Sequence, residues 1–459
     1  MKFDAVDFIK KLVKIPSVSA VSEHAADVAE CAGVLSEEFE RLGFASTIEK
    51  TPLHPIIFAR RDCPSGKPKA RVLCYGHYDV QPPEPLEKWH WKPFEPEVRN
   101  GRVLGRGTAD NKGPFTCLLA GIADFLQQHP DAPIDIGIMV EGEEEIGSPS
   151  MSEFIKKHPD LISSYDFIIL SDTSSPSPER IVVTVGLRGT VSFDAVFRGA
   201  KSDVHSGMFG GMIYNPVQAM AEVMASLHNS DGFVNVEHFY DGIEPIAEWE
   251  KNEIARSPFT AESVREFLGV RGLYRQGDTD PILAGKVLPT LEFTGIGGGY
   301  QGEGSKSVIP AECFFKSCIR TVPPQDTRKI LELVKAAIRA RTPEQVEVEF
   351  LEYDSAGDGY FVNPHSFGED ARSRKLAKAF AAVEECTEKC FGCRPLFLRE
   401  GASIPLIADI KKYTGLDSIM LGLFNPEDNL HAPDESFSVA TIEKARNYYK
   451  MFLERISQC

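Results

Sequence analysis

The chain has 459 residues, of which 42% are hydrophobic and 25% are charged, as in a soluble globular protein. Its 67 acidic residues outnumber its 50 basic ones, and the net charge of −17 argues against a protein that binds nucleic acid through a basic surface. The length exceeds what one hydrophobic core ordinarily supports, so we expect two domains.

The N-terminal residues 1–9 carry charges throughout and are not expected to be a secretion signal. No uninterrupted apolar run is long enough to span a bilayer, so no membrane partner is expected. The ten cysteines, among them Cys386, Cys390 and Cys393, are too sparse for a disulfide scaffold, and we predict free thiols rather than a zinc knuckle. These features indicate a cytoplasmic protein.

Apolar periodicity predicts that the first part of the chain alternates between helices and strands. The expected helices cover 3–13, 23–42 and 115–126, and the expected strands cover 46–50, 55–60, 71–76, 134–140 and 165–170. Such alternation is typical of an α/β domain.

The pattern changes after Gly186, where residues 191–197 alternate between apolar and polar side chains as in a half-exposed strand. The elements expected next are a helix over 215–229, a polar insertion without motifs over 230–286, strands over 288–294, 312–320 and 347–353, and a helix over 326–340. Without the insertion, the order β-α-β-β-α-β is ferredoxin-like. We therefore predict an inserted domain over 187–357.

The α/β rhythm returns after the inserted domain. The expected helices cover 373–389, 404–411 and 438–456, and the expected strands cover 395–398 and 418–423. Residues 1–186 and 358–459 are therefore predicted to be two parts of one parent domain.

Polar side chains follow the predicted strands of the parent domain. His77 and Asp79 come directly after the strand 71–76, and residues two apart on an extended chain point to the same side. An imidazole is a good ligand for a divalent metal, and a nearby carboxylate fixes its tautomer. A lone pair of this kind is more often part of a surface loop, so its interpretation depends on the other strand ends.

Acidic residues recur in three further places. Asp110 precedes a predicted helix, four acids occur within residues 141–145, and Asp172 follows an apolar strand. Each has an ordinary alternative: a helix N-cap, a solvated acidic turn and a turn cap, respectively. The glycines around Asp110 do not have the spacing of a phosphate-binding loop. His431 follows the strand 418–423 in the same way. The number of potential ligands expected at one edge of the sheet favours a metal site.

Five motifs of the chain resemble, in order, those of the M20 dizinc metallopeptidases. They are GHYDVQP at 76–82, GRGTADNKG at 105–113, EGEEEIGS at 141–148, SDT at 171–173 and HAPDE at 431–435. This family includes cytosolic non-specific dipeptidases, carnosinases, carboxypeptidase G2-like enzymes and acyl-amino-acid deacylases, and the dipeptidase branch fits best. The resemblance implies a zinc-exopeptidase-like catalytic domain, with a mixed sheet flanked by helices, and an inserted ferredoxin-like α+β lid through which the chain forms a homodimer.

The resemblance also implies two divalent metal ions per chain. Asp110 would bridge the ions, His77 and Asp172 would complete one site, and Glu145 and His431 would complete the other. Zn²⁺ is expected, and Mn²⁺ or Co²⁺ would also suit ligands that are mostly oxygen with one nitrogen per site. Two such ions lower the pKa of a shared water and polarise the scissile carbonyl.

Two residues beside the ligands receive roles from the same resemblance. Glu144 would be the general base, and Asp79 would orient His77. The peptide bond between Asp110 and Asn111 would be cis. In similar dipeptidases a second aspartate follows the bridging one, and Asn111 departs from that pattern.

Further motifs resemble the substrate site of the dipeptidases. They are AKSDVHSG at 200–207, SKSVIP at 305–310, CIRTVP at 318–323 and REGASIP at 399–405. His205 would help to bind the oxyanion in the neighbouring subunit. Arg320 would bind the free carboxylate of the substrate, assisted by Ser307 and Ser403. Without the resemblance, a polar loop for His205 and a strand-edge ion pair for Arg320 are the alternatives.

The sequence therefore predicts an enzyme that hydrolyses dipeptides or short peptides with a free C-terminal carboxylate, without a covalent intermediate. An N-acyl-amino-acid deacylase is the second candidate, since its substrates also offer a carboxylate to Arg320. A non-catalytic metal-dependent scaffold is the third, and it would be expected if Glu144 or a ligand were replaced.

Overall fold

The computed structural model describes residues 3–353 and 356–458. The chain divides into two compact units. The first unit comprises Met1–Val185, Val362–Leu398 and Asp409–Cys459, and the second comprises Gly186–Phe361 and Arg399–Ala408. The assignment of the inserted residues to a lid and dimerisation domain stays a prediction.

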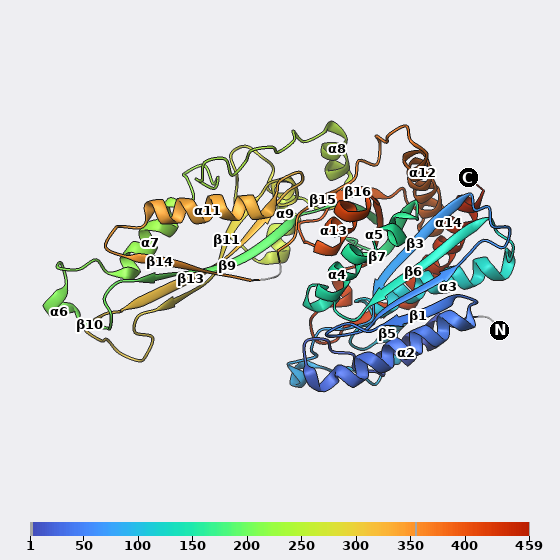
Figure 1. Cartoon of the computed structure of the whole chain (residues 1–459), viewed down its shortest axis with the longest axis horizontal. Helices are drawn as coiled ribbons and strands as arrows, with labels where there is room; N and C mark the ends of the chain where they lie inside the picture. The colour runs from blue at the N-terminus through green and yellow to red at the C-terminus, as the bar shows by residue number, and fades with distance from the viewer. Residues whose placement is uncertain (1–2, 354–355, 459) are drawn as a thin grey trace. The chain divides into compact units, whose positions relative to one another are not determined.

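A mixed sheet forms the centre of the first unit (Figure 1), with the strand order β1-β2-β6-β3-β7-β17-β8. These strands are β1 (Ala45–Glu49), β2 (Ile56–Arg61), β3 (Ala70–His77), β6 (Ile134–Glu141), β7 (Phe167–Ser174), β8 (Val182–Leu187) and β17 (Ser418–Phe424). β3 is parallel to both β6 and β7, and β17 is parallel to β7. The carboxyl ends of these four strands therefore meet at one edge of the sheet, which is where open α/β sheets bind their ligands.

Helices pack on this sheet, so β3 and β6 are buried along nearly their whole length. α3 (Lys112–Gln128) lies directly on β3, because a Cβ added at Gly76 would lie 2.4 Å from the ring of Phe115. α14 (Val439–Ser457) packs beside α3, and an ion pair between Arg446 and Asp124 joins the two helices.

The remaining helices of this unit are α1 (Ala5–Val13), α2 (Ala25–Arg41), α4 (Pro149–Lys157), α5 (Pro159–Ser163) and α12 (Ala371–Phe391), with the short 3₁₀ helices η1 (Ser22–His24), η2 (Leu86–Lys88), η3 (Glu144–Ile146) and η4 (Pro426–Asp428). The strand β16 (Leu396–Arg399) pairs with β8. The chain passes from the first unit to the second within β8, and it returns to the first unit within the helix α13 (Pro405–Thr414).

The second unit is built on a four-stranded antiparallel sheet with the order β11-β13-β9-β14. Its elements are β9 (Gly189–Arg198), α7 (Pro216–Ser226), β11 (Thr290–Gly298), β13 (Glu312–Thr321), α11 (Thr327–Arg341) and β14 (Glu347–Glu352). This β-α-β-β-α-β succession has the predicted ferredoxin-like order. Alternate residues of the strands, such as Phe193 and Phe315, form a hydrophobic core with apolar residues of α7 and α11, so the polar alternate residues occupy the other face.

Several elements of this unit were not predicted. The insertion over 230–286 contains α8 (Glu248–Arg256), α9 (Ala261–Leu268) and α10 (Pro281–Val287), and α7 ends at Ser226 rather than at 229. The short strands β10 (Val204–His205) and β12 (Val308–Ile309) form a pair beside α6 (Ser206–Phe209), and β15 (Tyr360–Phe361) pairs with the end of β8.

Among the described residues, no helix is long and apolar enough to cross a membrane. The nine cysteines of the described residues are free, and these include the three at 386, 390 and 393.

A small sheet joins distant parts of the first unit. It has the order β18-β5-β4 and consists of β4 (Glu97–Arg99), β5 (Arg102–Leu104) and β18 (Ser436–Ser438). This pairing places the buried carboxylate of Glu435 where it accepts hydrogen bonds from the backbone N–H groups of Gly107, Ala109 and Asp110, at 2.9, 2.8 and 3.1 Å. Glu435 also pairs with the buried guanidinium of Arg106 at 2.7 Å. The loop that carries Asp110 is thus held by a single carboxylate.

We expect the substitution Glu435→Ala to lower the free energy of unfolding by about 3–5 kcal/mol, because it leaves the buried charge of Arg106 without its partner. Asp434→Ala is the matched control, because Asp434 pairs with the imidazole of His90, whose side chain is 81% exposed. Such a pair contributes only about 0–1 kcal/mol. Urea unfolding of both variants measures the difference, and equal losses would contradict this role of Glu435.

Candidate metal centre

The predicted ligands come from segments at the carboxyl edge of the central sheet. His77 is the last residue of β3, and Asp172 lies near the end of β7. Glu145 lies in η3 just after β6, and His431 follows η4 after β17. Asp110 precedes α3, but the N-cap of this helix is Asn111, so the alternative interpretation of Asp110 as an N-cap is wrong.

The carboxylate of Asp110 lies between two imidazoles. Its Oδ1 is 3.1 Å from Nε2 of His77, and its Oδ2 is 2.9 Å from Nε2 of His431. Nε2 of His77 is also 3.6 Å from Asp172, and Nε2 of His431 is 3.2 Å from Glu145. These residues form two groups, each of which can hold a metal ion. One group is His77, Asp110 and Asp172, and the other is Asp110, Glu145 and His431. They share Asp110.

The chemistry of these groups fits a pair of divalent cations. Each group offers one imidazole nitrogen and two carboxylates, a donor set that suits zinc and related metals. Oε1 of Glu145 is buried and has no hydrogen-bond partner among the described residues. Burial raises the pKa of Glu145 to about 7, and the negative charge of Asp110 adds to this shift. Oε1 of Glu145 is therefore a buried acceptor to which a cation could bind.

Asp79 links His77, the last residue of β3, to η3, which carries Glu145. Its Oδ1 is 3.3 Å from Nδ1 of His77, as expected for a residue that orients this ring. The same carboxylate accepts hydrogen bonds from the backbone N–H groups of Glu144 and Glu145, at 3.2 and 3.1 Å. Asp79 thus also fixes η3, a role that the sequence did not reveal.

Glu144 lies at the edge of the cluster and belongs to neither group. Its side chain is 20% exposed, and its Oε2 is 4.0 Å from Nε2 of His77. Burial raises the pKa of Glu144 well above its usual value, and the negative charges of Asp172 and Glu145 add to the shift, although His77 opposes it.

Two amide side chains orient the ligands and were not predicted to do so. Nδ2 of Asn111 donates to Oδ1 of Asp172 at 2.8 Å and to the carbonyl of Ser171 at 2.6 Å. An aspartate at 111 has no such donor, so the departure from the dipeptidase pattern has a local function. Nε2 of Gln81 donates to Oε2 of Glu145 at 2.8 Å. The peptide bond between Asp110 and Asn111 is cis, as the resemblance implied.

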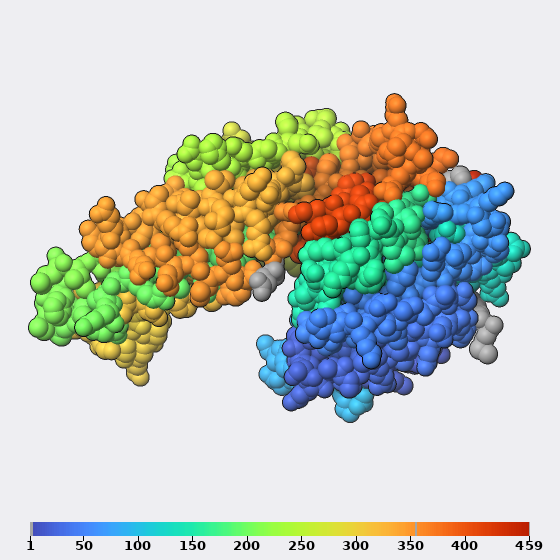
Figure 2. Space-filling view, in the orientation of Figure 1, coloured from blue at the N-terminus to red at the C-terminus, as the bar shows by residue number. Residues whose placement is uncertain are grey.

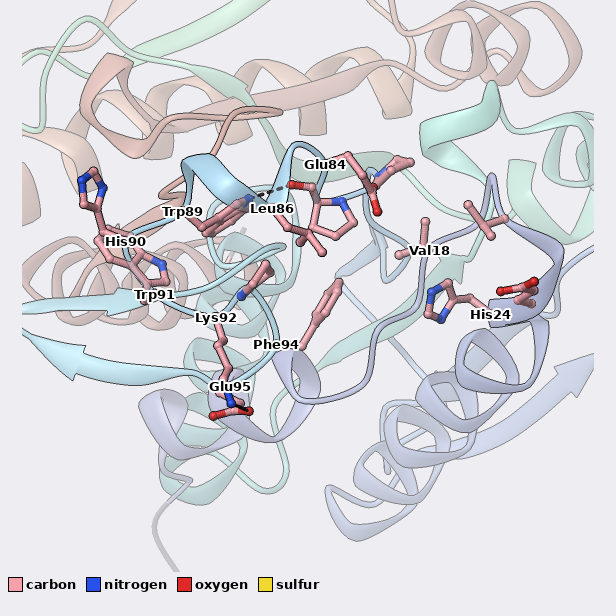
Figure 3. Close-up of a pocket in the computed structure, with 15 residues that line it drawn as sticks. Val18, His24, Glu84, Leu86, Trp89, His90, Trp91, Lys92, Phe94 and Glu95 are labelled. Atoms are coloured by element: carbon pink, nitrogen blue, oxygen red, sulfur yellow. Dashed lines mark hydrogen bonds and ion pairs between the residues drawn. The ribbon is translucent and has the colours of Figure 1, made fainter.

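The loop after Gln81 lines a cavity of about 780 Å³ in the first unit (Figure 3). Its wall is largely aromatic and apolar, with Trp89, Trp91 and Phe94 on one side and Val18 and His24 on the other. Both ends of this loop contact segments that carry predicted ligands. Gln81 contacts Glu145, and His90 pairs with Asp434, three residues after His431.

The predicted substrate-binding residues lie in the second unit. Nη1 of Arg320, on β13, donates to the hydroxyl of Ser403 at 2.6 Å, so the structure brings these two residues together. Ser307 lies instead beside the loop that begins at His205, because the carbonyl of Ser307 accepts a hydrogen bond from the N–H of Ser206 at 3.1 Å. His205 is exposed at the start of this loop, in the strand β10.

Residues 73–455 of the chain match the peptidase family M20/M25/M40. The chain is 27% identical to the Cys-Gly metallodipeptidase DUG1 of Saccharomyces cerevisiae, over 98% of this chain and 95% of the relative. It is also 27% identical to the Beta-Ala-His dipeptidase of Mus musculus, over 89% of this chain and 82% of the relative.

A similar solved structure is that of the M20 family metallo-carboxypeptidase Sso-CP2 from Sulfolobus solfataricus. It is 26% identical to this chain, covers 100% of both chains and has a TM-score of 0.86. The fold, a mixed sheet flanked by helices, is thus that of M20 peptidases. The chain belongs to the peptidase family M20/M25/M40 and is a metal-dependent hydrolase.

Proposed function

We propose that this protein is a dimetal dipeptidase, which hydrolyses the amide bond of dipeptides or short peptides that end in a free carboxylate. The observation that carries the proposal is the pair of ligand groups that share Asp110. A carboxylate that two metal ions share is a usual feature of two-metal hydrolytic sites. The names of the relatives, a Cys-Gly metallodipeptidase and a Beta-Ala-His dipeptidase, support dipeptides as substrates.

In this proposal His77, Asp110 and Asp172 hold one ion, and Asp110, Glu145 and His431 hold the other. Zn²⁺ is the metal we propose, with Mn²⁺ and Co²⁺ as alternatives that the same ligands accept. When bound, the two ions supply electrophilic polarisation of the scissile carbonyl and make a water acidic enough to attack it.

Glu144 is the general base of the proposed reaction. Its position outside both ligand groups leaves a carboxylate oxygen to accept a proton from the attacking water. Oε2 then donates this proton to the amine that leaves, so the amide bond breaks without a covalent intermediate. Asp79 keeps both Glu144 and the ring of His77 in place.

The substrate's free carboxylate is bound by Arg320, with the hydroxyl of Ser403 beside it. A planar guanidinium suits this role because it donates two parallel hydrogen bonds to a carboxylate. An N-acyl-amino-acid deacylase would use the same arginine. The relatives from Saccharomyces cerevisiae and Mus musculus are dipeptidases, and this favours the dipeptidase over the deacylase.

We also propose a homodimer, formed through the second unit, in which His205 and Ser307 serve the partner's substrate. The segment around α6 and β10 lies at one tip of this unit (Figure 2). Met208 and Met212 near it are 67% and 73% exposed. Exposed apolar side chains of this size commonly mark an interface, and methionine adapts well to one.

Glu144→Ala should lower kcat by about 10²- to 10⁴-fold, because it removes the group that accepts the proton. The metal content, measured by elemental analysis, should stay near that of the wild type. Glu145→Ala is the comparison, because it removes a ligand and should lower the metal content. Retained hydrolysis by Glu144→Ala would remove Glu144 from its role.

Arg320→Ala should lower kcat/KM about tenfold or more for Cys-Gly and β-Ala-His, because it removes a charged hydrogen bond to the carboxylate. The C-terminal amides of these dipeptides should be affected far less. Arg198→Ala, at the exposed end of β9, is the control. Equal losses on both kinds of substrate would contradict the assignment of Arg320.

Mixing His205→Ala with Glu144→Ala tests the action of His205 across a dimer. Each variant alone should be nearly inactive, but a mixed dimer has one complete site. Random mixing should restore about a quarter of the wild-type activity. A chain that sediments as a fully active monomer, or a mixture that stays inactive, would refute the dimer-dependent role.

A further inference from the structure

A second arginine of the second unit lies next to Arg320. Arg188 directly precedes β9, and in the pairing of β9 with β13 Gly189 is opposite Thr321 while Thr190 is opposite Arg320. Ile319 and Val191, one residue further along each strand, belong to the hydrophobic core, so Arg320 lies on the opposite, polar face of the sheet. The two arginines thus occupy the same end of this sheet.

One short loop binds both arginines. The backbone N–H of Arg188 donates to the carbonyl of Ala402 at 3.1 Å, and its Nε donates to the carbonyl of Gly401 at 2.7 Å. The next residue, Ser403, accepts from Arg320. The loop packs closely here, since a Cβ at Gly401 would lie 3.0 Å from the carbonyl oxygen of Gly285 and 3.4 Å from Nη2 of Arg188. Gly401 and Ser403 therefore bind the two guanidiniums, and Ala402 between them binds the backbone of Arg188.

Arg188 is largely buried beside a second positive charge. Burial and the positive charge of Arg320 together lower the pKa of Arg188 to about 10, although Glu292 and Glu400 oppose this. Nη1 of Arg188 is buried and has no hydrogen-bond partner among the described residues. A buried donor without a partner costs about 1–3 kcal/mol, and more if it is charged. An anion between the two arginines would remove this cost.

We propose that Arg188 is a second carboxylate-binding residue, which with Arg320 and Ser403 forms a two-guanidinium site for the free carboxylate of the substrate. The arrangement provides a buried donor for an incoming anion, in addition to the one that Arg320 supplies. It would make a free carboxylate a requirement for tight binding rather than a preference. This inference rests on the proposed function only in identifying the anion as part of the substrate.

The substitution Arg188→Met removes the charge but keeps much of the side-chain volume. We expect kcat/KM for Ala-Gly to fall about tenfold or more, mainly through KM, because a charged hydrogen bond to the substrate is lost. Ala-Gly amide should be affected less than about threefold, because it has no carboxylate to lose contact with. Arg188→Lys keeps the charge but loses the planar guanidinium that can donate two parallel hydrogen bonds. Its kcat/KM for Ala-Gly should lie between those of Arg188→Met and the wild type.

Arg198→Met is the matched control, since Arg198 is the last residue of the same strand and pairs on the surface with Glu312. It should leave the ratio of kcat/KM between Ala-Gly and its amide unchanged. Thermal unfolding shows whether each variant is folded. A change of this ratio in Arg188→Met supports the inference, whereas equal losses on both substrates, or no loss, would overturn it.

Binding separates this inference from the proposed function. The reduced-amide analogue of Ala-Gly has a free carboxylate but no scissile carbonyl, and calorimetry measures its affinity without turnover. If the wild type hydrolyses no dipeptide but binds this analogue about tenfold more tightly than Arg188→Met does, the dipeptidase proposal fails and the anion site stands. If the wild type hydrolyses dipeptides and both proteins bind the analogue equally, the inference fails and the proposed function stands.

Discussion

The carboxylate of Asp110 makes contact with the imidazoles of both His77 and His431, and the rest of the centre depends on where this one group is held. It stands on a loop whose N–H groups point at the buried carboxylate of Glu435. The carboxylate of Asp79 likewise accepts hydrogen bonds from the N–H groups of Glu144 and Glu145. In both cases backbone dipoles compensate the buried negative charge, which places the acidic residues before any cation is bound.

The clustering of the potential ligands followed from the sequence because parallel strands carry a simple rule, whereas their division between two metal ions was implied by the resemblance to M20 peptidases. Residues after the carboxyl ends of β3, β6, β7 and β17 meet at one edge, so His77, Glu145 and His431 were expected together even though long stretches of chain separate them. Periodicity was equally informative for the ferredoxin-like unit, where Phe193 and Phe315 lie in the core.

The supporting contacts did not follow from the sequence, because they depend on details of tertiary structure. Glu435 reaches the loop of Asp110 only because β18 and β5, three residues each, pair across more than three hundred positions. Asn111 looked like a departure from a motif until its amide was seen to orient Asp172. No sequence motif pointed to Arg188. Its proposed role rests on the neighbouring charge of Arg320 and on its own buried Nη1 group. The helices of the 230–286 insertion, α8, α9 and α10, are only nine, eight and seven residues long, and so short a stretch gives little periodic signal.

The discontinuity of the first unit has a consequence for how the protein is made. Its N-terminal part emerges from the ribosome with four of the five predicted ligands, but His431 and the Glu435 carboxylate that holds the loop of Asp110 follow only after the whole inserted unit. Domains generally fold during synthesis in the order in which they appear. With the proposed ligands, the nascent chain cannot complete its metal centre until its last segment docks, so a chain stalled during translation would be unable to cleave peptides.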